Sequence, residues 1–208
     1  MRLVFVLAAC LALAGCSGKI SRKSLLIYFE PAVPAASMAG QPENGYPFKL
    51  QVKRLKLTPL YDNAKVITRT SDYTVDFANN ASWAIRPDVS ATDLLVQTCK
   101  SVLLVKSVRE TLIDELPDYV ISGDILVIEE DERGSKRKAS LAVELRITKS
   151  SGTLLFEKKY KAAAECDGSG YTILAERFSI LLADIYGSFI KDAISVFNKE
   201  LTAANDAN

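Results

Sequence analysis

The sequence predicts an α+β domain: an antiparallel β-sheet with two helices packed on one face. Two observations predict this class. Alternating apolar and polar residues, typical of strands, occur in residues 48–77 and again in residues 119–164. A segment with helical spacing follows each group of strands, at residues 90–105 and at residues 171–201. The chain has no internal repeat and no shift in composition, so we expect one domain.

The clearest strand pattern lies in the second group, which we expect to form an antiparallel meander. Leu141, Val143, Leu145 and Ile147 alternate there with small or polar residues. Residues 31–47 hold four prolines and should form a loop, and residues 79–82 should form a turn. The expected strands are residues 24–30, 48–57 with a bulge near Arg54, the hairpin 65–69 and 73–77, and the meander 119–132, 137–149 and 153–164.

The two expected helices differ in how well their ends are marked. Ser90 or Asp88 should cap the first helix, with Asp93 placed as in a capping box. Residues 108–116 should extend this helix or form a second short one. The last helix carries an apolar stripe. The core-facing positions of the first helical segment are Leu94, Leu95, Thr98, Cys99, Val102 and Val105.

The first sixteen residues have the pattern of a secretory signal peptide. Arg2 supplies the positive charge, residues 3–13 are apolar, and small residues lead up to Gly15. The apolar run is shorter than the about 20 residues that a membrane-spanning helix needs. The junction of Gly15 with Cys16 looks like a bacterial lipobox, in which the cysteine thiol receives a diacylglycerol. The alternative is an ordinary signal peptide that happens to contain Cys10 and Cys16.

Cleavage between Gly15 and Cys16 would make Cys16 the first residue of the mature protein. Its diacylglycerol and an N-linked chain such as palmitate would then hold the protein on a membrane, since each buried methylene contributes about 0.8 kcal/mol. Ser17 follows the cysteine; by resemblance to Gram-negative lipoproteins, this favours the periplasmic side of the outer membrane. We expect four parts: a signal peptide (1–15), a lipidated tether (16–23), one domain (24–202) and a flexible tail (203–208).

The composition disfavours several classes of function. Lys and Arg number 26 against 25 Asp and Glu, so no bulk charge attracts nucleic acid. The chain has no histidine, which removes the common nucleophile systems and the commonest metal ligand. A zinc ion would have to use Cys99, Cys166 and carboxylates, which is a poor site. We therefore expect no enzyme, no metal ion and no cofactor beyond the lipid on Cys16.

The two cysteines of the folded domain leave two alternatives open. A disulfide between Cys99 and Cys166 is permitted in an oxidising periplasm and would contribute roughly 4 kcal/mol through loop closure. Two buried thiols acting as small apolar side chains are the other alternative. The spacing does not choose between them, because it does not show whether the two α-carbons approach.

Two further features invite a functional interpretation. The acidic run Glu129–Glu132 is followed by basic residues up to Lys138, and a solvated hairpin tip is favoured over a docking surface. The run lacks the spacing of a calcium loop. Asp167–Gly170 precedes a helix without the residues of a nucleotide loop, so a simple turn is the better interpretation.

Four short segments carry a resemblance to a known family. Tyr61-Asp62, Lys65–Arg69, Ser71–Phe77 and Trp83–Pro87, followed by a helix, resemble the ABC-type transport auxiliary lipoproteins of the paraquat-inducible C type. The similarity covers most of residues 16–200. The proline-rich loop departs from the shorter connection typical of the family.

The resemblance implies a non-enzymatic periplasmic subunit tethered to the outer membrane through Cys16. Such a subunit docks on an MCE-type tunnel protein, fed by an inner-membrane ABC transporter or permease, and the system moves phospholipid or other hydrophobic molecules between the membranes. We expect Trp83 to contribute to the interface, and a ring of several copies is compatible with this role. The alternatives are an accessory lipoprotein of outer-membrane or lipopolysaccharide assembly, or a structural envelope lipoprotein.

Overall fold

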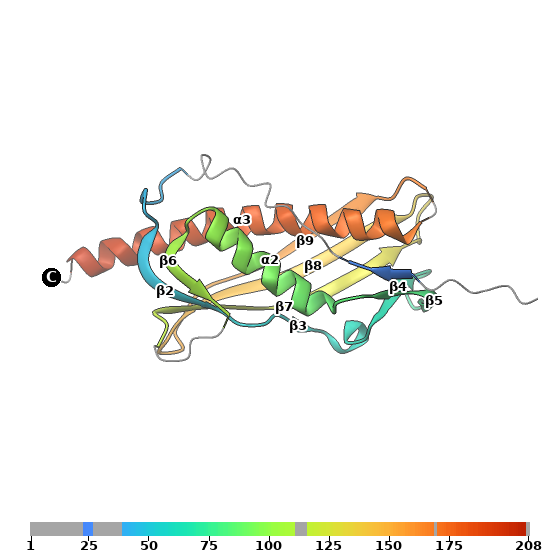
Figure 1. The fold of residues 1–208 in the computed structure, drawn as a ribbon, viewed down its shortest axis with the longest axis horizontal. Helices are drawn as coiled ribbons and strands as arrows, with labels where there is room; N and C mark the ends of the chain where they lie inside the picture. The colour runs from blue at the N-terminus through green and yellow to red at the C-terminus, as the bar shows by residue number, and fades with distance from the viewer. Residues whose placement is uncertain (1–22, 27–38, 111–115, 169, 207–208) are drawn as a thin grey trace, which may run out of the picture.

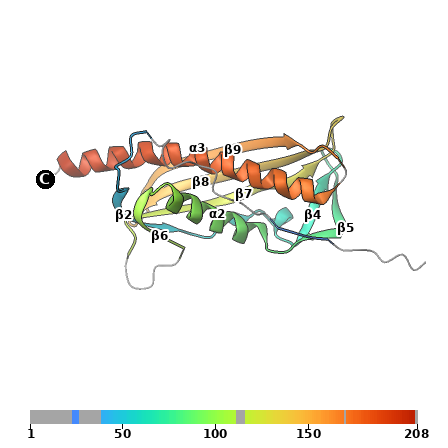
Figure 2. The same ribbon diagram turned by 45° about the horizontal axis from the view of Figure 1, so that its top comes forward.

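The structure is a computed structural model that describes residues 23–26, 39–110, 116–168 and 170–206. These residues form a nine-stranded sheet with two helices, α2 and α3, on one face (Figures 1 and 2). The elements are β1 (Lys23–Leu25), β2 (Tyr46–Val52), β3 (Lys56–Leu57), the 3₁₀ helix η2 (Pro59–Tyr61), β4 (Lys65–Arg69), β5 (Val75–Trp83), α2 (Pro87–Ser101), β6 (Val105–Arg109), β7 (Tyr119–Asp131), β8 (Lys138–Lys149), β9 (Leu154–Glu165) and α3 (Tyr171–Asp206).

Strand β7 organises the sheet, because both of its edges are paired over most of its length. One edge pairs with β8 in an antiparallel ladder, and β8 pairs in the same way with β9. The predicted meander is therefore confirmed. The other edge receives β2, β3 and β4 one after another, all parallel to β7. Residues 46–69 thus follow the edge of β7 in one direction, with interruptions between the three short strands.

The predicted purely antiparallel sheet is wrong, and the sheet is mixed. Five strand pairs are parallel, namely β2, β3 and β4 with β7, β6 with β2, and β1 with β5. The antiparallel pairs are the meander and the β4–β5 hairpin, which was predicted. Alternation along a strand fixes which side chains face the core, but it carries no information on the direction of the neighbouring strand.

Several local predictions fail where tertiary pairing decides the structure. Residues 79–82 continue β5 instead of turning, because Ala81, Ser82 and Trp83 pair with β1. The helix predicted over residues 108–116 is wrong in the described part of that segment: β6 extends to Arg109 beside β2. Residues 111–115, like 27–30 of the predicted first strand, lie outside the described residues.

The predicted cap of α2 is also wrong. The helix begins at Pro87, so Arg86 holds the N-cap position, and no side chain caps the helix there. Asp88 instead accepts a hydrogen bond from the guanidinium of Arg86 at 3.0 Å. A proline in the first turn has no N–H to satisfy, which lowers the need for a capping side chain. The predicted bulge near Arg54 corresponds to the break between β2 and β3.

The core lies between the helices and the sheet. The predicted core positions of the first helical segment are all buried, although Val105 belongs to β6. The stripe of α3 packs on β8 and β9, and α3 continues to Asp206, beyond the predicted end at Leu201. The Tyr186 hydroxyl donates to the Ala91 carbonyl of α2 at 2.8 Å, which links the two helices. Phe197 of α3 packs between the rings of Tyr46 and Tyr119.

The elongated molecule has two distinct ends (Figure 1). We call the end with the β4–β5 turn (70–74) and the β7–β8 turn (132–137) the hairpin end. The far end holds the α2–β6 turn (102–104), residues 116–118 and the β8–β9 turn (150–153). Strand β7 runs between them with 13 residues. At about 3.3 Å per residue, the ends are roughly 40 Å apart.

Candidate functional site

The predicted anchor, Cys16, lies outside the described residues, as does the Gly15–Cys16 junction. The first described residue, Lys23, begins β1 at the side of β5, opposite Ala81. Because β1 and β5 are parallel and β5 begins at the hairpin, the N-terminal end of β1 at Lys23 points toward the hairpin end. Within the described part of the chain, no helix is both long and apolar enough to span a bilayer.

At the hairpin end, two turns far apart in the sequence are joined by one guanidinium. Arg133 of the β7–β8 turn donates to Asp72 of the β4–β5 turn at 2.8 Å and to both carboxylate oxygens of Asp131. The hydrogen bonds from Arg133 lower the pKa of Asp131 to about 2. Beside Asp72, Tyr73 projects from the turn with its side chain fully exposed.

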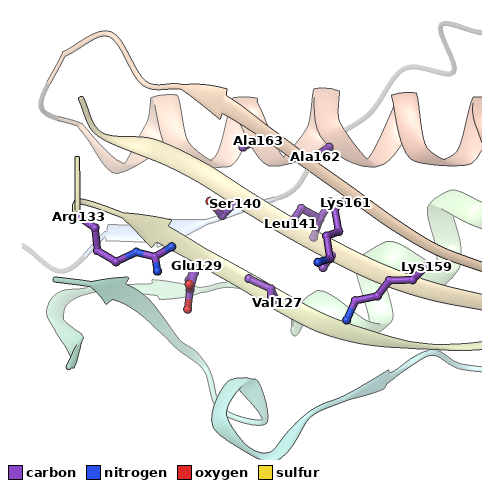
Figure 3. A pocket seen from close by; sticks show the side chains of 10 residues that line it. Val127, Glu129, Arg133, Ser140, Leu141, Lys159, Lys161, Ala162 and Ala163 are labelled. Carbon is purple, nitrogen blue, oxygen red and sulfur yellow. The ribbon is translucent and has the colours of Figure 1, made fainter. Parts of the chain in front are cut away.

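The face of the sheet opposite the helices carries an open groove of about 490 Å³ over β7, β8 and β9 (Figure 3). Its floor is formed by small side chains, and Lys159 and Lys161 of β9 reach across β8 toward β7. Arg133 lines the groove where it meets the hairpin end. The floor residues are Val127, Ser140, Ala142 and Ala163.

The nearby carboxylates of the groove face form ion pairs with Arg146 and not with Lys159 or Lys161. Arg146 contacts Asp124 at 2.6 Å, Glu157 at 2.5 Å and also Glu144, which lies directly opposite Lys159 in the β8–β9 ladder. Lys159 and Lys161 make no ion pair with any other described residue. Since the ammonium groups are point charges over a small-residue floor, the groove can hold an anionic group such as a phosphate.

Glu129, the carboxylate that lines the groove, is buried, and its charge is balanced by that of Arg69. It accepts from Arg69 Nε at 2.5 Å and from the Tyr61 hydroxyl at 2.6 Å. Burial and this hydrogen bond raise the pKa of Tyr61. Because the Arg69 charge balances that of Glu129, the cluster adds no net negative charge to the groove.

The predicted solvated tip at Glu129–Glu132 is therefore wrong for the first two residues of the run. Glu129 and Glu130 are both buried, and they point to opposite faces of β7. Glu130 contacts Arg137, which in turn donates to the carbonyls of Gly168 and Gly170 and so holds the start of α3. No cluster of three metal-ligating side chains occurs among the residues that the structure describes.

The other predicted site residues lie apart from this groove. Trp83 is 7% exposed and packs edge-on against Phe178 at 5.8 Å, so its indole offers little surface to a partner. Cys99 in α2 and Cys166 after β9 are both free and buried. Burial raises the pKa of the Cys99 thiol to about 12 and also raises that of Cys166, so both thiols are protonated at neutral pH.

Comparison with known proteins places the chain in a family. The family model described as "ABC-type transport auxiliary lipoprotein component" matches residues 29–187. The chain belongs to this family. The sequence resemblance is thereby confirmed, and the auxiliary lipoproteins are associated with ABC transport systems and are generally non-catalytic.

Two solved structures share the fold of this auxiliary lipoprotein. One is protein XCC0632 from Xanthomonas campestris, a member of family DUF330, with a TM-score of 0.68 and 15% identity over 80% of this chain and 96% of its own. The other is a crystal structure of an uncharacterized protein, with a TM-score of 0.61 and 14% identity over 82% of this chain and 99% of its own. No curated protein matches the chain.

The groove and the exposed tyrosine could not be recognised from the sequence. The groove lysines come from β9, but their unpaired state depends on Arg146 of β8 and on carboxylates of three different strands. Tyr73 belongs to one of the segments that carry the family resemblance, but its exposure depends on how the turn projects from the hairpin. Neither feature has a local sequence signal.

Proposed function

We propose that this auxiliary lipoprotein is the outer-membrane-anchored periplasmic subunit of an MCE/ABC-type intermembrane lipid transport system. The family match over residues 29–187 carries the proposal. The Gly15–Cys16 lipobox supports attachment to a membrane through acyl chains, and Ser17 supports the outer membrane. The role is positional: the anchored domain receives the end of the transport tunnel and holds it near the membrane.

The far end is the surface that we assign to the tunnel protein. Three leucines are exposed there: Leu103 in the α2–β6 turn, Leu116 shortly before β7, and Leu154 at the start of β9. Apolar side chains that are exposed in the isolated domain favour contact with a protein partner, because their burial removes apolar surface from water. This surface lies opposite the hairpin end, toward which the N-terminal end of β1 points, so an anchored domain could contact the membrane and a periplasmic partner at the same time.

The α2–β6 turn that carries Leu103 is held in a fixed shape by its contact with Gly45. Leu103 has a left-handed backbone, with φ of 50°. Gly45, with φ of +70°, approaches the Leu103 carbonyl so closely that a β-carbon at Gly45 would lie 2.3 Å from that oxygen. Glycine is therefore required there. A preformed surface loses less conformational entropy on binding than a disordered one.

The proposal is tested by purifying the tagged full-length lipoprotein from cross-linked cells and identifying the proteins that accompany it. We expect an MCE protein and an ABC transporter or permease. Recovery of outer-membrane assembly or lipopolysaccharide-export proteins in their place would overturn the proposal. The Cys16→Ala variant serves as the control for membrane attachment.

A further inference from the structure

The tip of the β4–β5 hairpin is placed where an acyl anchor would bring it to a bilayer. From Lys23, opposite Ala81, to Val75 at the start of β5 the hairpin extends six residues, or about 20 Å. Lys23 follows Cys16 by seven positions, a stretch that reaches at most about 25 Å. The segment from Cys16 to Lys23 is therefore long enough for the anchor to reach the level of the hairpin tip, toward which the N-terminal end of β1 points.

The turn at this tip presents one aromatic side chain on a rigid support. The Thr74 carbonyl accepts hydrogen bonds from the amides of Thr70 and Ser71, at 3.1 and 3.3 Å, and the Ser71 hydroxyl accepts one from the amide of Tyr73. Asp72 is fixed by Arg133. Tyr73 is the one side chain of the turn that is large and apolar, and it is 100% exposed.

The chemistry of the tip suits the boundary between lipid and water. Tyrosine has an apolar ring and a polar hydroxyl, and it is enriched at membrane interfaces for this reason. Two carboxylates of this end, Asp72 and Asp131, are paired with Arg133, so their charges are balanced by the guanidinium. The contact should therefore depend on Tyr73 more than on ionic attraction.

We propose that the β4–β5 turn is a membrane-contact site, in which Tyr73 enters the interfacial layer of the bilayer that holds the acyl chains of Cys16. The contact sets the orientation of the domain, with the hairpin end toward the lipid and the far end toward the periplasm. The acyl chains supply the affinity, and Tyr73 limits the tilt. This inference rests on the acylation of Cys16 in the proposed function.

The test uses the mature acylated lipoprotein bound to vesicles of phosphatidylethanolamine and phosphatidylglycerol. An environment-sensitive fluorophore is attached through Tyr73→Cys and, in a matched control, through Leu116→Cys at the far end, where the native side chain is 84% exposed. Cys99 and Cys166 are buried, so they should label little, and the parent protein measures that background. We expect at least a twofold fluorescence increase and quenching by spin-labelled lipid at position 73, and neither change at position 116.

A second pair of variants isolates the tyrosine itself. The first variant carries the fluorophore at Thr74→Cys and keeps Tyr73. In the second, Tyr73→Ser is added, and the quenching of the fluorophore at position 74 by spin-labelled lipid should fall by at least half. Quenching that is equal at positions 73 and 116, or absent at 73 while the protein floats with the vesicles, would overturn the inference and leave the anchor intact. Failure of the acylated protein to float would refute the anchor and the inference together.

Discussion

The two ends of the molecule differ in the chemistry of their exposed side chains. At the hairpin end, charged groups from two turns pair with one another around Arg133, and Tyr73 is the prominent apolar group. At the far end, the exposed leucines are Leu103, Leu116 and Leu154, from two connections and the start of β9. This difference is the basis of our two proposals, a lipid surface as the neighbour of the hairpin end and a protein as the neighbour of the far end.

Loss of the anchor should have the largest effect on function. In Cys16→Ala the thiol that would carry the acyl chains is absent, so the protein should be found in the soluble periplasmic fraction and transport should fail. The folded domain should be unchanged, because β1 begins seven residues later. Cell fractionation, thermal unfolding and a complementation assay test this together. Full complementation from the soluble periplasm would contradict the positional role.

Changes at the far end should weaken partner binding without unfolding the domain. In Leu116→Asp a charge replaces an exposed leucine, and we expect at least a tenfold loss of the co-purified partner. The matched control is Ile85→Asp between β5 and α2, where the isoleucine is 47% exposed. An equal loss in both variants would show that the far end is not the specific contact.

Replacing Arg69 or Arg133 with alanine should show how differently a buried and an exposed ion pair contribute to the stability of the hairpin end. Arg69→Ala leaves the carboxylate of Glu129 buried without its charged partner, which should cost about 3–5 kcal/mol of unfolding free energy. Arg133→Ala breaks pairs in which the arginine is exposed, so the loss of unfolding free energy should be much smaller. Urea unfolding of both variants measures the difference. Similar losses would mean that the Arg133 pairs also hold the end together.

The smallest expected effect is a pH dependence at the same end. The folded pKa of Asp131 is about 2, below the value of about 3.9 in an unfolded chain. A lowered folded pKa gives stability that is present above pH 4 and is lost as the pH falls toward 2. Acid unfolding of Asp131→Asn should lack this component. An unchanged acid profile between pH 4 and pH 2 would exclude it.

Much of the fold could be predicted because its longest elements depend on local pattern. The β7–β8–β9 meander and α3 combine clear periodicity with short connections, and the structure confirms them. The parallel strands along β7 could not be predicted, since their direction depends on pairing between distant segments. Strand β6 was missed because five residues with two valines suit either a helix end or a strand.

The sites were harder to predict than the fold. The run Glu129–Glu132 suggested a solvated tip, but Tyr61 and Arg69 arrive from η2 and β4 to bury and neutralise Glu129. Trp83 suggested an interface, but its position beside Phe178 places it in the core. In both cases the charge or ring was visible in the sequence, and the side chain that covers it was distant along the chain.

In-cell photo-crosslinking from the two ends tests the central claim most directly. A photoreactive amino acid is placed at Leu116 or at Tyr73 in the acylated lipoprotein. The account predicts protein adducts, with the MCE protein among them, from position 116 and lipid adducts from position 73. Protein adducts from position 73 with none from position 116 would contradict the assignment of the two ends.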